Sequence, residues 1–343
     1  MVLTGFEEKV SAVLDCFPAE TVFLAAVSGG ADSMAMLAAL LAVKKERLLF
    51  CLHVEHGLRP ASESSGDADF VKAFCKSNGI KCRVVHILKG KIADYSQRKG
   101  TGIEAAARYF RHRVLSKEAD RLGKNTVILL AHTKNDLLEL SLMRVLRGAG
   151  PMGLAIMPQK RGRLFRPLLN MTRSDITGYL TEKNISWRED ATNTDVKFLR
   201  NRIRRRLVPF LNETFPIWKK GVYVMAETQA LVSEFIVNEA AARIKWERTS
   251  ESLFTNEENF FTQPQIIREE AVFLGINFLC SFIGLQTRTG KLKTIKRSVL
   301  GKFCTGRINA ADLGLYRLKR EKGKVILSRV KKEFFERGVS QLI

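Results

Sequence analysis

The sequence has 343 residues, of which 45% are hydrophobic and 27% charged, a composition typical of a globular protein long enough for two domains. Its 57 Lys and Arg against 35 Asp and Glu give a formal net charge of +22, which predicts a polyanionic partner, nucleic acid in preference to an anionic membrane. The longest apolar run, 34–43, is too short to span a bilayer and the first residues show no secretory signal, so we expect a cytoplasmic protein without a membrane segment.

The first half of the chain alternates short apolar runs with helical segments. Strands are predicted over 21–27, 48–53, 81–87 and 126–131, and helices over 33–43, 64–78, 102–121 and 135–147. The polar, basic segment 89–101 is predicted to be a mobile loop, which either folds over a ligand or has no function. Strands separated by helices predict an α/β fold with a doubly wound parallel sheet, whose ligands bind past the carboxyl ends of the strands.

The second half begins after a stretch rich in Gly and Pro at 148–167. A helix is predicted over 172–184, and five arginines fall within the seven residues 200–206. We place a catalytic domain at 1–208 and a smaller, mainly helical basic domain at 209–343. The latter consists of a helical linker, 209–285, and a basic α/β part, 286–343. This last part holds 16 basic and four acidic residues, and 308–320 with 324–329 predict a β-hairpin.

The most informative stretch is Ser28-Gly29-Gly30-Ala31-Asp32-Ser33, where an apolar strand ends and a helix begins. Glycine lets the backbone approach an oxyanion closely, and amides at a helix start carry partial positive charge. Neither G-x-x-x-x-G-K-[ST] nor G-x-G-x-x-G occurs, so the stretch predicts a phosphate loop without a lysine. The alternative is an ordinary strand–turn–helix connection in which Asp32 caps the helix.

Further motifs follow in order at the ends of predicted strands and near helix starts. They are His53-Val54-Glu55-His56-Gly57-Leu58-Arg59, Gly102-Ile103-Glu104-Ala105-Ala106-Ala107-Arg108-Tyr109-Phe110-Arg111, Ala131-His132-Thr133-Lys134-Asn135-Asp136-Leu137-Leu138-Glu139, and Asp190-Ala191-Thr192-Asn193 followed by Arg200-Asn201-Arg202-Ile203-Arg204. Together with the phosphate loop, this ordered set resembles the bacterial tRNA(Ile)-lysidine synthetases, which are N-type PP-loop ATP pyrophosphatases. The resemblance covers residues 1–205.

The resemblance implies a ligase of tRNA modification that uses ATP and Mg²⁺. Members of this family join free L-lysine to C2 of the wobble cytidine of tRNA(Ile) with the anticodon CAU, forming lysidine. ATP activates the C2 oxygen as an adenylate, the ε-amino group of lysine displaces AMP, and pyrophosphate is released. The sequence leaves open whether the protein is a monomer or a homodimer.

The resemblance also implies roles for residues around the phosphate loop. Residues of the loop bind the ATP phosphates, namely Ser28, Gly29, Gly30, Ala31, Asp32 and Ser33. Asp32 additionally holds Mg²⁺. Asp32 and His132 are both implied to be catalytic residues. His53 and His132, at strand ends, border the nucleotide; the alternative for both is a buried histidine satisfied by the backbone. Their spacing does not indicate a zinc site.

Two helical pairs complete the implied site. Arg108 and Arg111 share a helix face and form a cationic clamp on the α-phosphate, unless they form an ion-pair ladder with Glu104. Asp136 and Glu139 share a face at a helix start and bind the α-amino group of lysine. The alternative is a favourable placement of carboxylates near the helix N-terminus, worth about 0.3–1 kcal/mol, and the two interpretations are compatible.

The arginine run is assigned to tRNA phosphates, through Arg200, Arg202, Arg204, Arg205 and Arg206. Four positions depart from the family pattern and bear on lysine recognition. Asn135 stands in place of an aspartate, Leu140 in place of a threonine, His112 in place of a tyrosine, and Glu55 is atypical in its motif.

Two other functions compete with lysine ligation. A PP-loop tRNA thiolase acting on an anticodon-loop base needs a sulfur carrier, but the six cysteines include no C-x-x-C pair and their spacing shows no zinc, iron–sulfur or redox motif. A non-catalytic RNA-binding protein would be expected to lack the phosphate loop or Asp32, and both are present.

Overall fold

The computed structural model describes residues 3–58, 61–189, 199–282 and 297–330. Its contacts define two compact units, the first made of 1–149 and 156–226 and the second of 150–155 and 227–343. The division between the units falls inside helix α11 (Trp218–Arg243). The functional boundary after residue 208 stays a prediction, and the motif Asp190-Ala191-Thr192-Asn193 lies outside the described residues.

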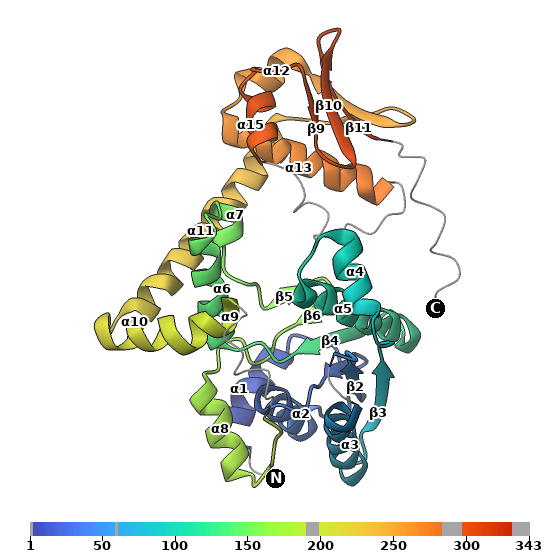
Figure 1. Cartoon of the computed structure of the whole chain (residues 1–343), viewed down its shortest axis with the longest axis vertical. Helices are drawn as coiled ribbons and strands as arrows, with labels where there is room; N and C mark the ends of the chain where they lie inside the picture. Colours follow the sequence, from blue (N-terminus) through green and yellow to red (C-terminus); the bar gives the residue numbers. More distant parts are fainter. Residues whose placement is uncertain (1–2, 59–60, 190–198, 283–296, 331–343) are drawn as a thin grey trace. The chain divides into compact units, whose positions relative to one another are not determined.

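The first unit is built on a six-stranded sheet with the order β3-β2-β1-β4-β6-β5 (Figure 1). Its strands are β1 (Val22–Ala26), β2 (Leu49–Glu55), β3 (Lys81–His86), β4 (Thr126–Leu130), β5 (Lys160–Arg161) and β6 (Leu164–Phe165). All neighbouring pairs are parallel except β5 with β6. After β1 the chain adds strands first on one side and then on the other, so the strand order reverses at β1. This confirms the predicted doubly wound fold.

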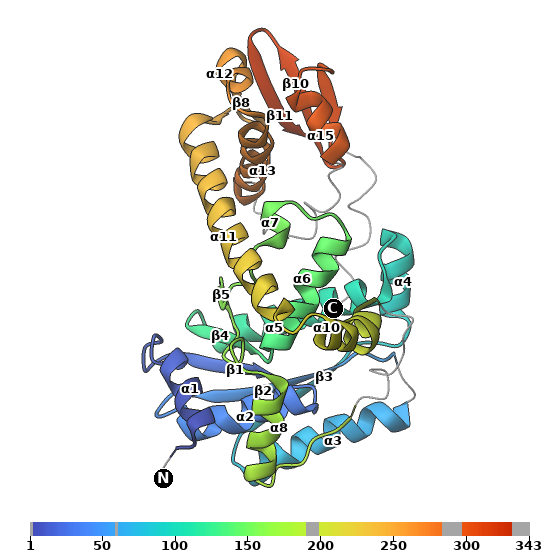
Figure 2. The ribbon, with the colours of Figure 1, turned by 90° about the vertical axis from the view of Figure 1, so that its left-hand side faces the viewer.

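Helices cover both faces of this sheet, as Figures 1 and 2 show. One face packs against α1 (Gly5–Leu14), α2 (Ala31–Val43), α3 (Ala61–Ser77) and α8 (Arg173–Glu182), and the other against α5 (Ile103–Leu122). Every residue of α2 from 34 to 40 is at most 7% exposed. A helix that is apolar around its circumference must be buried, and this burial fixes the first turn of α2 beside the end of β1.

The segment 89–101 contains helix α4 (Lys91–Lys99), so the prediction of a mobile loop was wrong. Gly90 and Gly100 cap the helix, both with a positive φ that glycine adopts readily. Ile92 is 1% exposed, and Tyr95 stacks on Tyr109 of α5 with ring centroids 4.5 Å apart. Ile92 and Tyr95 are the apolar residues that pack this short helix against the first unit, and its other residues are mostly polar, which favoured the prediction of a loop.

The last helices of the first unit carry the arginine run. After β4 comes α6 (Lys134–Leu146), which packs against α9 (Leu199–Arg202) and against the single π-helical turn η2 (Ile203–Leu207). Helix α10 (Val208–Thr214) continues from η2. The run therefore lies on helical backbone beside the start of α6.

The second unit combines helices with an antiparallel sheet of order β7-β8-β11-β10-β9. Its elements are α7 (Pro151–Leu154), β7 (Glu247–Arg248), β8 (Ser252–Asn256), α12 (Glu257–Thr262), α13 (Gln265–Phe282), α15 (Arg297–Cys304), β9 (Ala310–Asp312), β10 (Tyr316–Glu321) and β11 (Lys324–Arg329). The predicted hairpin is formed by β10 and β11, and it is extended by β8, which the sequence pattern placed in a helical region. None of the helices in the described ranges is long and apolar enough to cross a membrane.

Candidate functional site

The turn between β1 and α2 has the geometry of an anion-binding loop. Gly29 has a φ of +92°, and Gly30 is the N-cap of α2. The Ser33 hydroxyl accepts a hydrogen bond from the Ser28 amide at 3.1 Å and donates one to the Gly30 carbonyl at 2.9 Å, which fixes the shape of the turn. Amides in the first turn of a helix have no intrahelical acceptor, so those of Ala31 and Asp32 are available to an oxyanion.

Asp32 lies in the first turn of α2 but is not its cap, since Gly30 takes that position. Among the described residues, no hydrogen-bond donor reaches its buried Oδ1. Burial raises the pKa of Asp32 and the negative charge of Asp136 raises it further, while Arg173 and Arg204 oppose these effects. A buried carboxylate oxygen without a partner, close to a second carboxylate, fits a hard cation such as Mg²⁺.

His53 braces the strand that leads into the phosphate loop. Its Nδ1 lies 2.9 Å from the carbonyl oxygen of Val27, and because a carbonyl only accepts, we assign the ring proton to Nδ1. Burial lowers the pKa of His53, which keeps the ring neutral. The backbone thus satisfies Nδ1, as expected of a buried structural histidine. Contact between the ring and a nucleotide stays a prediction.

Helix α5 contributes two arginines with little charge compensation. Burial, with the nearby charges of Arg108 and Arg200, lowers the pKa of Arg111 to about 10, and the buried Nε of Arg111 has no acceptor among the described residues. Partial desolvation and the charge of Arg200 also lower the pKa of Arg108. Glu104 makes no direct ion pair with either arginine among the described residues, although its negative charge partly opposes the lowering of both pKa values. Guanidinium groups gathered in this way favour an anion between them.

His132 and Arg166 add to the same edge of the sheet, since they follow the parallel strands β4 and β6. Burial and the charges of Arg166 and Arg111 lower the pKa of His132 to about 2, so its imidazole is neutral at physiological pH. The Nη1 of Arg166 donates to the Pro158 carbonyl at 2.8 Å, but its buried Nε has no partner in the described ranges. Arg166 was not predicted from the sequence, because β6 has only two residues and no recognisable strand pattern. The one indication in the sequence was an arginine directly after an apolar pair.

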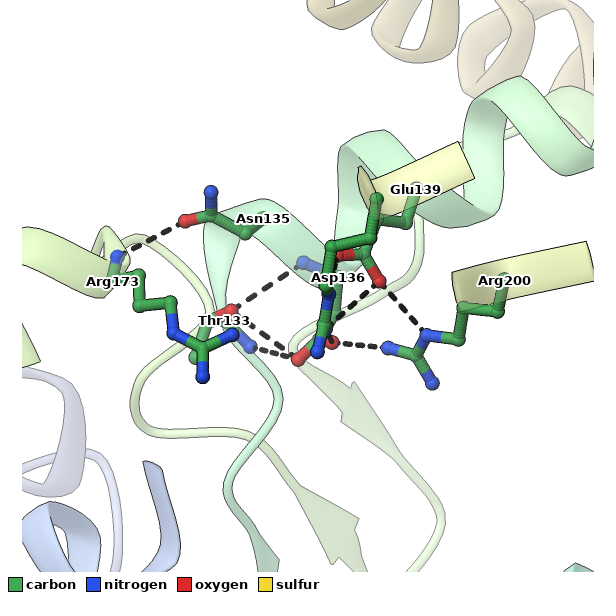
Figure 3. A network of polar contacts seen from close by, with 7 residues as sticks. Thr133, Asn135, Asp136, Glu139, Arg173 and Arg200 are labelled. Atoms are coloured by element: carbon green, nitrogen blue, oxygen red, sulfur yellow. Dashed lines mark hydrogen bonds and ion pairs between the residues drawn. The ribbon is translucent and has the colours of Figure 1, made fainter. Parts of the chain in front are cut away.

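Asp136 and Glu139 are buried at the start of α6, at 7% and 4% exposure. The Oδ2 atom of Asp136 accepts the Thr133 amide at 2.8 Å and closes a capping box (Figure 3). One oxygen of Asp136 therefore stabilises the start of the helix, as the alternative interpretation expected. Its other oxygen, Oδ1, pairs with Arg200.

Arg200 and Arg204, which α9 and η2 contribute, neutralise these two carboxylates. The Nε of Arg200 donates to Glu139 Oε2 at 2.8 Å, and the Nε of Arg204 donates to Glu139 Oε1 at 2.5 Å. Residues four apart share a helix face, which explains why these two arginines turn inward together. The other three, Arg202, Arg205 and Arg206, are exposed. The arginine run is thus divided between an internal ion-pair network and the surface.

Of the four positions that depart from the family pattern, two make polar contacts and two are partly buried. The Oδ1 of Asn135 accepts the backbone amide of Arg173 at 3.0 Å, which joins the starts of α6 and α8 (Figure 3). Glu55 pairs with His86 on the neighbouring strand. Leu140 is partly buried. Burial and the charges of Arg111 and Arg108 lower the pKa of His112 to about 4.

The buried histidines make the stability of the first unit depend on pH. The unfolded chain protonates His112 and His132 below about pH 6.5, whereas the folded chain binds these protons only near their lowered pKa values of about 4 and about 2. Their neutral forms therefore cost no stability above about pH 6.5. As the pH falls below that value, the free energy of unfolding should decrease by about 1.4 kcal/mol per pH unit for each histidine.

Urea unfolding of the full chain at about pH 7.5 and about pH 5.5 tests this expectation. His112→Gln should remove the part of the decrease that this histidine contributes, about 1.4 kcal/mol per pH unit below about pH 6.5. An equal pH dependence in the parent protein and His112→Gln would contradict the assignment.

A family model described as a PP-loop domain matches residues 3–211, which is more than half of the chain. The chain belongs to the PP-loop family. The match spans the phosphate loop, the arginines of α5, the carboxylates of α6 and the arginine run. It confirms the predicted family and supports the expectation that this domain binds ATP.

Relatives named tRNA(Ile)-lysidine synthase match over the same region. The protein of Treponema denticola is 45% identical over 223 residues, which cover 64% of this chain and 47% of that protein. The protein of Deinococcus radiodurans is 42% identical over 207 residues, covering 60% and 34%. That of Shouchella clausii is 33% identical over 272 residues, covering 77% and 57%. The chain spans about half the length of the curated relatives it matches.

Among solved structures, a U34-tRNA thiolase from Methanococcus maripaludis with its [4Fe-4S] cluster has the same fold. The TM-score is 0.54 at 16% sequence identity, and the match covers 67% of this chain and 78% of the thiolase. At this identity the likeness concerns the fold alone.

Proposed function

We propose that this PP-loop protein joins free L-lysine to C2 of the wobble cytidine of tRNA(Ile) with the anticodon CAU. An adenylated tRNA is the intermediate, and AMP and pyrophosphate are the other products. Similarity to relatives named for this activity supports the proposal. The observation that carries most weight is structural: partly desolvated arginines and two buried carboxylates gather at the sheet edge that carries the phosphate loop.

The first half-reaction uses the loop and the arginines. The first-turn amides of α2 hold the departing pyrophosphate, and Arg108 and Arg111 offset the charge that accumulates on the α-phosphate. Mg²⁺, which Asp32 would hold, supplies further neutralisation of phosphate charge. His132 stays neutral, so it contributes a hydrogen bond to the nucleotide.

The second half-reaction uses the two carboxylates of α6. Asp136 and Glu139 bind the α-ammonium group of lysine and leave the ε-amino group free to attack C2. In the free protein Arg200 and Arg204 occupy both carboxylates, so lysine must replace at least one guanidinium. A phosphate of bound tRNA offers the displaced arginine a new partner. We therefore infer that lysine binds more readily once tRNA is in place.

The surface for tRNA includes the exposed members of the arginine run. Arg202, Arg205 and Arg206 are free of the internal network and point to solvent, where phosphate contacts are made. We keep 209–343 as the tRNA-binding domain and 1–208 as the catalytic domain, because the basic excess of 286–343 suits a polyanion.

Incorporation of labelled lysine into tRNA tests the function. The full chain is incubated with ATP, Mg²⁺, labelled lysine and a tRNA(Ile) transcript bearing the anticodon CAU. Label should enter the tRNA, and Asp32→Asn should lower the rate by at least about 100-fold, the effect expected of a lost electrostatic stabiliser. Asp15→Asn, at an exposed aspartate paired with Lys45, should retain the rate. Absence of lysine incorporation, or an undiminished rate in Asp32→Asn, would refute the proposal.

A further inference from the structure

Three cysteines that are far apart in the sequence meet inside the first unit. Cys51 lies in β2, Cys75 in the last turns of α3 and Cys82 in β3, and their Sγ atoms all lie within 4.8 Å of one another. Cys51 and Cys75 are 1% and 0% exposed, whereas Cys82 is partly exposed. No sequence motif indicates this cluster, because metal-binding motifs are recognised by short spacing and these thiols come from three separate elements.

The sheet explains why two of the three sulfur atoms are close together, but not why the third joins them. Cys51 and Cys82 are register neighbours on adjacent parallel strands, so their proximity follows from the sheet. Cys75 comes from a helix, and its thiol completes a triangle with the other two. A lone buried cysteine behaves as a small apolar side chain. Three thiols whose sulfur atoms lie within 4.8 Å of one another instead form a set of soft ligands with no carboxylate among them.

This cluster is separate from the proposed ATP site. Cys51 pairs in register with Ala25, which lies three residues before Ser28 in β1. At about 3.3 Å per residue the cluster is therefore about 10 Å back from the phosphate loop, within the sheet. Cys51 and Cys75 belong to the hydrophobic core there, so a thiol from this pair cannot reach a nucleobase.

We propose that Cys51, Cys75 and Cys82 bind one Zn²⁺ ion through three thiolates. A single ion with Zn–S bonds of about 2.3 Å places its sulfur ligands about 3.8 Å apart, so the triangle has only to contract slightly. Each thiol releases its proton to solvent as its sulfur–zinc bond forms. The partly exposed side of the cluster, at Cys82, leaves the fourth position to water.

The surroundings suit a cation held by thiolates. Lys72 lies one helical turn before Cys75 on α3. Three thiolates on Zn²⁺ leave one net negative charge, which Lys72 offsets. An iron–sulfur cubane fits less well, because its cysteines bind different iron atoms and so stand further apart than one shared ion requires.

Cobalt substitution tests this site without ATP or tRNA, so its outcome is independent of the proposed ligase activity. The reduced full chain is titrated with Co²⁺ under anaerobic conditions, and thiolate-to-cobalt charge-transfer absorption is followed. The absorption should saturate at one equivalent, and Zn²⁺ should remove it by displacing cobalt. Bound Zn²⁺ should also raise the melting temperature, since an ion that binds only the folded chain stabilises it.

Two variants and a matched control locate the ligands. Cys75→Ala should lose the absorption, and Cys82→Ser, at the partly exposed position, should weaken it at least tenfold while the circular dichroism stays that of the parent. Cys304→Ala is the control, because Cys304 is also 0% exposed and also ends a helix, in the second unit. No charge-transfer absorption in the parent, or an unchanged absorption in Cys75→Ala and Cys82→Ser, would overturn the proposal.

Discussion

Arg111→Met should lower the rate of tRNA-dependent pyrophosphate release by at least about 100-fold, with little change in the melting temperature. Methionine keeps much of the length of the side chain and its apolar contacts, so the variant removes mainly the charge. The Arg111 guanidinium is partly desolvated beside Arg108 and Arg200, and its buried Nε lacks an acceptor within the described residues. A charge held in this way interacts strongly with the anion that develops at the α-phosphate.

Arg113→Met provides the control for this experiment. Arg113 lies on the same helix, is exposed, and donates a hydrogen bond to the Tyr109 hydroxyl at 3.3 Å. Its loss removes the same charge from α5 but from the surface, so the rate should stay within about twofold of the parent. Equal losses in the two variants would show that α5 acts through net charge, and the clamp would have to be abandoned.

Asp136→Asn should raise the KM for lysine at least about tenfold, a loss of about 1.4 kcal/mol of binding. Asparagine keeps an oxygen for the Thr133 amide but loses the charge that attracts an ammonium group. Pyrophosphate release in the absence of lysine should fall less than lysine transfer does, because Asp136 acts mainly in the second half-reaction.

Asp175→Asn separates recognition of lysine from helix capping. Asp175 closes the same kind of capping box at the start of α8, where its Oδ2 accepts the Thr172 amide at 2.7 Å. If Asp136 mattered only as a cap, both variants would have similar effects on stability and on catalysis. We expect a higher KM for lysine in Asp136→Asn alone, and an unchanged KM there would exclude this carboxylate from lysine binding.

Local features of the site could be predicted from the sequence, because each depends on a few consecutive residues. The phosphate loop required only a strand, two glycines and a helix start. Arg108 and Arg111 required helical spacing, and Asp136 a position in a first helical turn. The parallel sheet followed from alternating apolar runs, and its strand order placed these separate motifs at one edge.

Features that depend on tertiary packing could not be predicted. The pairing of Arg200 and Arg204 with the carboxylates of α6 joins segments more than 60 residues apart. Arg166 follows a two-residue strand, which is too short for a recognisable pattern. Helix α4 was mistaken for a loop because charged residues dominate it. The thiol cluster required three elements to be packed before it became visible.

The proposed function requires that the turn at 28–33, which contains no lysine, holds the pyrophosphate that leaves when a nucleobase is adenylated. The most direct measurement follows the phosphorus products of [γ-³²P]ATP and [α-³²P]ATP together with labelled lysine in the same reaction. Pyrophosphate and AMP should appear in equal amounts, each matching the lysine incorporated into tRNA(Ile). Release of orthophosphate and ADP, or pyrophosphate formation that does not require the CAU tRNA, would contradict the claim.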